Sequence, residues 1–119
     1  MMGVGGVQDP QVWEDHSTLR GQPDGSETRY TIGLKGRLDD RWAEAFRIVQ
    51  GESPVYARFR LERSTSAIGF SCRVVDGAVS VFDGLERLEK LVKAVNERVE
   101  FWQTQNPAVV AAFDARGVA

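Results

Sequence analysis

Apolar residues follow a helical period most clearly between residues 84 and 103. They recur there at alternating spacings of three and four, at Leu85, Leu88, Val92, Val95, Val99 and Trp102. At 100° per residue these positions, together with Leu91, span an arc of about 120°. That stripe is wider than a coiled-coil seam and is typical of a helix lying on a sheet. Asp83, three residues before Glu86, resembles a capping box at the start of this helix.

Upstream of this helix, apolar and polar residues alternate with the period of a β-strand. The alternating stretches are YTIGLKG (30–36), VYARFRLE (55–62) and AIGFSCRVV (67–75). A further strand is predicted over 78–82, because Asp76-Gly77 suits the positive φ values of a type I′ hairpin turn. The two hairpins place the same side chains on one face, which fixes the register. The predicted cross-strand pairs are Leu61 with Ile68, Arg60 with Gly69, Phe59 with Phe70, Val55 with Val74, Arg58 with Ser71 and Tyr56 with Arg73.

A shorter helix is predicted between the first two strands, in LDDRWAEAFRIVQG (38–51). Asp39 or Asp40 can cap its first turn, and Gly51 is placed to end it. After Pro107, AVVAAF predicts a short helix, with a strand as the alternative. The order β-α-β-β-β-α predicts an α+β domain in which a long C-terminal helix and one N-proximal helix pack on one face of an antiparallel-rich, four-stranded sheet. This plait-like order resembles ferredoxin-like and double-stranded-RNA-binding folds in outline, a likeness that implies no function.

Residues 1–27 show neither period. They contain five acidic residues and one basic residue, and GQPDGSE is typical of a loop. We therefore predict a flexible acidic N-terminal tail over 1–27 and a single α+β domain over 28–119.

Composition restricts the class of protein. The formal charge is −2, and no run of apolar residues approaches the eighteen or so that a membrane span needs. The start of the chain lacks the basic and apolar regions of a secretory signal. A single cysteine rules out an internal disulfide. With twelve arginines against three lysines, we expect a bacterial, cytoplasmic protein that contacts no membrane.

Few residues suit catalysis or metal binding. Structural zinc needs about four convergent ligands, and the chain has one cysteine, Cys72, on an inward strand position, and one histidine, His16, in the predicted tail. The adjacent carboxylates Asp39 and Asp40 are better explained by helix capping than by acid–base chemistry. We therefore expect no catalytic residue, no cofactor and no metal.

Basic and aromatic side chains gather on the predicted outer face of the sheet. They are Tyr56, Arg58, Arg60 and Arg73, with Lys35 on a flank. Arginine forks and an aromatic ring on an open sheet are typical of surfaces that bind single-stranded nucleic acid or a phosphorylated ligand. A solvated strand face, or one covered by a partner protein, remains the alternative.

Several apolar residues exceed what one sheet–helix interface can bury. They are Phe82, Val75, Phe101 and the C-terminal Val109 and Phe113. This surplus predicts a small, non-catalytic protein-interaction module that pairs with itself as a homodimer or binds another protein. Nucleic-acid or anion binding on the sheet face is the first alternative. A ligand-binding or cofactor-free enzyme domain, with a pocket between the sheet and the long helix, is the second.

Overall fold

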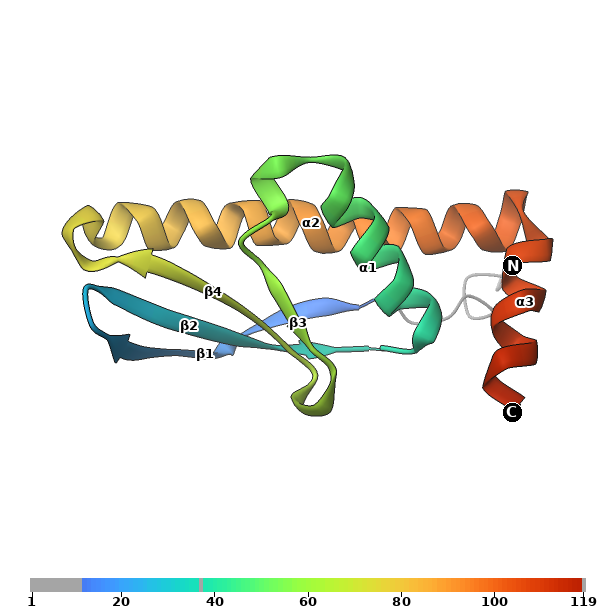
Figure 1. The fold of residues 1–119 in the computed structure, drawn as a ribbon, viewed down its shortest axis with the longest axis horizontal. Coiled ribbons are helices and arrows are strands. Elements are labelled where there is room, and N and C mark those ends of the chain that lie inside the picture. Colours follow the sequence, from blue (N-terminus) through green and yellow to red (C-terminus); the bar gives the residue numbers. More distant parts are fainter. Residues whose placement is uncertain (1–11, 37, 119) are drawn as a thin grey trace, which may run out of the picture.

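The computed structural model describes residues 12–36 and 38–118, and their side chains as far as residue 112. Four strands form one antiparallel sheet in the order β1-β2-β4-β3, and a long helix, α2, crosses it (Figure 1). The elements are β1 (Trp13–Asp24), β2 (Glu27–Lys35), α1 (Asp40–Glu52), β3 (Arg60–Glu62), β4 (Ala67–Arg73), α2 (Gly77–Gln105) and α3 (Pro107–Val118). Single 3-10 turns η2 (Pro54–Tyr56), η3 (Arg63–Thr65) and η4 (Val74–Asp76) connect them. The predicted α+β class, with a four-stranded sheet, a long C-terminal helix and an N-proximal helix, is confirmed.

The core lies between α2 and the sheet. The inner stripe of α2 predicted from the sequence is buried, with Leu88, Leu91 and Val95 each at 0% exposure. It belongs to the same cluster as Ile32 of β2 and Ile68 of β4, both also at 0%. Burying side chains of this size contributes about 1.5–3 kcal/mol each. None of the described helices is long and apolar enough to cross a membrane.

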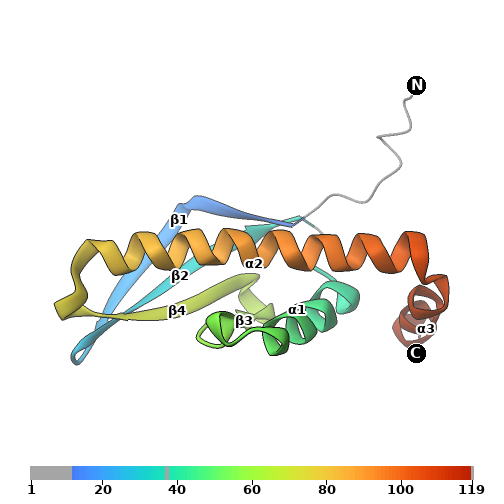
Figure 2. The ribbon, with the colours of Figure 1, turned by 90° about the horizontal axis from the view of Figure 1, so that it is seen from above.

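Helix α1 lies alongside α2, on the opposite side from β1 (Figure 2). Its N-cap is Asp39, whose carboxylate accepts a hydrogen bond from the backbone N–H of Trp42 at 3.0 Å. This satisfies a donor that the first turn leaves free. Trp42 and Phe46 are buried in the common core, so the predicted helix and its inner face are confirmed.

The prediction of a flexible tail is wrong for residues 13–24, which form a strand. Residues 13–24 form β1, an edge strand paired with β2, and residues 1–11 lie outside the described part of the chain. The register shifts between Asp15 and Arg20, so a bulge interrupts the alternation that marks a strand. The loop-like sequence around Gly25 (φ +66°) is a hairpin turn between β1 and β2.

The predicted strand over 78–82 is also wrong, because α2 begins at Gly77 and a 3-10 turn, η4, precedes it. Half-buried Val81 and Leu85 extend the stripe of α2 upstream. The apolar residues in 77–83 therefore fit a helical period as well as a strand period. The element order is β-β-α-β-β-α-α, and β1 supplies the fourth strand. The capping box at Asp83 is wrong for the same reason, since that residue lies inside the helix.

The predicted strand over 55–62 is shorter than expected. Pro54 begins the 3-10 turn η2, and β3 covers only Arg60–Glu62. The pairs Leu61 with Ile68 and Arg60 with Gly69 are confirmed. The pairs predicted for residues 55, 56 and 58 are wrong, because these residues are not in a strand. Phe59 still meets Phe70, with ring centroids 5.5 Å apart.

Candidate functional site

The basic face predicted from the sequence is not assembled. Tyr56 is in the turn η2, and Arg58 follows that turn with its guanidinium 3.6 Å from the Asp83 carboxylate of α2. Of Tyr56, Arg58, Arg60 and Arg73, only Arg60 keeps its predicted cross-strand neighbour, Gly69. Because β3 covers only Arg60–Glu62, Tyr56 and Arg58 are not on the sheet and do not form a continuous surface with Arg60.

The remaining two basic residues lie at strand ends and are paired. Arg73 ends β4, with its Nε 3.3 Å from a carboxylate oxygen of Asp76. Lys35 ends β2, with its Nζ 3.2 Å from Asp15 of β1. The predicted anion-binding residues are thus distributed over three regions of the molecule, most of them beside a carboxylate.

The predicted interface residues also separate into distinct regions. Phe82 is 70% exposed in the second turn of α2, whereas Phe101 is 53% exposed near the other end. Nineteen residues of helix place them about 28 Å apart along its axis. Val109 is half-buried against the core, and the side chain of Phe113 is outside the described residues.

Phe82 belongs to a group of exposed apolar side chains, which we call the apolar end of α2. The group comprises Val74, Val75, Val79 and Phe82, which are 59%, 80%, 78% and 70% exposed. Val74 and Val75 lie in the turn η4, directly before the helix. Val79 and Phe82 are three residues apart within α2, so their side chains are neighbours on its surface.

A groove of about 580 Å³ runs between β1 and α2. Val12 and Val92 contribute apolar lining. Asn96 joins its two walls: its amide donates a 2.7 Å hydrogen bond to the carbonyl of Val12 and accepts from the backbone N–H of Val12 and the indole N–H of Trp42. The beginning of β1 is therefore held to α2 by a side chain whose donor and acceptor are both used.

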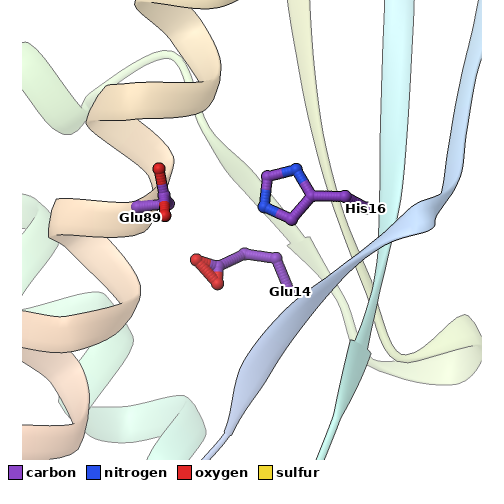
Figure 3. Close-up of side chains that lie close together, drawn as sticks. All are labelled: Glu14, His16 and Glu89. Carbon is purple, nitrogen blue, oxygen red and sulfur yellow. The ribbon is translucent and has the colours of Figure 1, made fainter.

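Three potential metal ligands converge next to this groove. Glu14 and His16 of β1 point toward Glu89 of α2 (Figure 3). One carboxylate oxygen from each glutamate and one imidazole nitrogen all lie within 4.8 Å of one another. Residues i and i+2 of a strand share a face, which explains why Glu14 and His16 point the same way.

The bulge that follows Glu14 is held by local hydrogen bonds. The Asp15 carboxylate accepts from the backbone N–H and hydroxyl of Ser17, at 3.1 and 2.6 Å. The hydrogen bond from Ser17 and the contact with Lys35 lower the pKa of Asp15 below its ordinary value. Thr18 donates to the Asp15 carbonyl and accepts from the Gly33 N–H, both at 2.7 Å. These contacts fix the backbone on either side of His16.

The reasoning from sequence missed Glu14 and Glu89 and placed His16 in a tail. Glu-x-His was a usable signal, because it places two ligands on one side of any strand. The prediction of a flexible tail over residues 1–27, in place of a strand, concealed this signal. Comparison of the chain with family models, curated proteins and solved structures gives no significant match.

Proposed function

We propose that this protein is a non-catalytic interaction module that pairs with a second copy of itself through the apolar end of α2. The exposure of Val75, Val79 and Phe82, at 80%, 78% and 70%, carries this proposal. A single exposed apolar residue is ordinary, whereas adjoining large ones mark an interaction surface.

A hollow in the surface next to the apolar end supports the proposal that the partner is a second copy of the chain. The hollow has a volume of about 410 Å³, and its lining includes Tyr30, Cys72 and Val81 together with Val74 and Phe82 of the apolar end. A two-fold dimer requires one surface that complements itself. A helix ridge beside a hollow meets that requirement, because each copy can present its ridge to the hollow of the other.

Sedimentation equilibrium of the full chain across the micromolar range tests the proposal. The wild-type protein is expected to approach twice the monomer mass of 13.2 kDa as concentration rises. Phe82→Ser should stay monomeric, because it replaces the apolar contact with a hydroxyl. Phe101→Ser is the matched control, since Phe101 is exposed on the same helix outside the apolar end, and this variant should associate like wild type.

Two results would remove the proposal. One is a wild-type protein that stays at 13.2 kDa throughout. The other is an equal loss of association in Phe82→Ser and Phe101→Ser, which would show that the apolar end is not the contact surface.

A further inference from the structure

We infer that Glu14, His16 and Glu89 form a binding site for a divalent transition metal of the zinc class, which joins β1 to α2. The site is independent of the proposed self-association, because none of its residues belongs to the apolar end. Its ligands come from two elements, and His16 and Glu89 are more than seventy positions apart in the chain.

The spacing of the donor atoms suits a metal after small side-chain movements. Three ligands at zinc–ligand distances of about 2.0–2.2 Å lie roughly 3.4 Å apart in a tetrahedral site. The donors of Glu14, His16 and Glu89 are within 4.8 Å of one another. His16 and Glu89 are exposed and Glu14 is half-buried, so side-chain rotation can close this difference without moving the backbone.

The donor types select the metal. An imidazole nitrogen suits zinc and neighbouring transition metals, whereas magnesium and calcium prefer oxygen ligands throughout. No thiolate belongs to the cluster, which disfavours soft copper(I). Three protein ligands leave a fourth position for water, as in open zinc sites.

The local charge favours a cation. Among the residues that the structure describes, none forms a side-chain hydrogen bond or ion pair with the side chains of Glu14, His16 or Glu89, so their donor atoms are available to a cation. A divalent cation between the two carboxylates gains a favourable interaction with each of them. The groove beside them is lined by five glutamates and two lysines, and one of these lysines, Lys90, pairs with Glu86 at 3.5 Å.

The backbones that carry the ligands are already fixed. Asn96 holds Val12 to α2, two residues before Glu14. The hydrogen bonds of Asp15 and Thr18 hold the irregular segment of β1 in which His16 lies. Ligands held in place before binding lose less conformational freedom when the metal arrives.

The test is titration of the full, untagged and chelator-treated chain with zinc chloride, followed by calorimetry and by NMR of the histidine ring nitrogens. The chain has only one histidine, so every ring signal reports on His16. We expect one zinc per chain and a large shift of one ring nitrogen. Zinc should also raise the melting temperature, because it binds only the folded arrangement.

Matched variants distinguish zinc binding at Glu14, His16 and Glu89 from non-specific attraction of zinc to the acidic groove. His16→Asn and Glu89→Gln should each weaken zinc binding by more than about tenfold, the loss seen even for residues that only orient a ligand. Glu100→Gln removes the same charge from another glutamate of the groove and should bind zinc like wild type. Cys72→Ser should also bind normally, since the Cys72 thiol is buried away from the cluster.

Three outcomes would overturn the inference. They are the absence of zinc binding by the wild-type chain, an equal loss in Glu100→Gln and Glu89→Gln, and loss of binding in Cys72→Ser with an unmoved His16 signal. The circular dichroism spectrum of each variant confirms its fold, and sedimentation of His16→Asn shows whether self-association is unaffected.

Discussion

The first two turns of α2 and the turns that follow belong to one helix but have different surroundings. Beyond residue 84 the inner stripe is enclosed, with Leu88 and Leu91 at 0% exposure. Before residue 84, Val79 and Phe82 are 78% and 70% exposed. The later turns therefore stabilise the domain, whereas Val79 and Phe82 of the first turns contribute little to the core. This difference is the basis on which we propose that the apolar end contacts a second copy of the chain.

Gly84 marks the boundary between the two regions. A Cβ atom at this position would lie 2.7 Å from Cε2 of Phe70 in β4, closer than side chains approach. The absence of a side chain thus lets the helix approach the sheet closely. On the N-terminal side of this contact, the side chains of Val79 and Phe82 are exposed to solvent.

The largest expected effect comes from the enclosed region. Leu88→Ala should lower the free energy of unfolding by about 2–5 kcal/mol, because it removes apolar contacts and leaves a cavity. Urea denaturation of the isolated variant measures this loss. A change below about 1 kcal/mol would mean that the later turns do not form the stabilising core.

An intermediate effect is expected at the boundary. Gly84→Ala should destabilise the fold by about 1–3 kcal/mol, because the added methyl group clashes with the Phe70 ring. Gly51→Ala is the matched control: it is also helical, with open space around it, and should stabilise by about 0.5–1 kcal/mol through helix propensity. Thermal denaturation compares the two, and stabilisation by Gly84→Ala would contradict the close contact.

The smallest effect on folding is expected at the apolar end. Val79→Ser should change the free energy of unfolding of the monomer by less than about 0.5 kcal/mol, because its side chain is 78% exposed. The measurement is urea denaturation at a concentration where the protein is monomeric. A loss comparable with that of Leu88→Ala would show that the first turns also support the core.

Patterns that persist over many residues predicted the fold well. The stripe from Leu85 to Trp102 repeats over five turns, so a single ambiguous position could not change the prediction. The pair Leu61 with Ile68 followed from a short loop and matching apolar alternation. Both depend on local sequence, which is available without the structure.

Shorter or interrupted patterns failed for physical reasons. β1 is an edge strand with a bulge, so no continuous buried row reveals it. The residues from Ala78 to Phe82 fit a strand and a helix equally, and continuity with the stripe of α2 decided between them. The cluster of Glu14, His16 and Glu89 depends on β1 lying across α2, which no local pattern encodes.

The most direct test of the proposed interaction surface is a dilution series of amide NMR spectra of the wild-type protein. Self-association through the apolar end predicts concentration-dependent shifts at Val74 to Phe82 and at the neighbouring residues of β2, with little change from residue 99 to 110. Shifts concentrated around Phe101, or spectra that do not change with concentration, would contradict it.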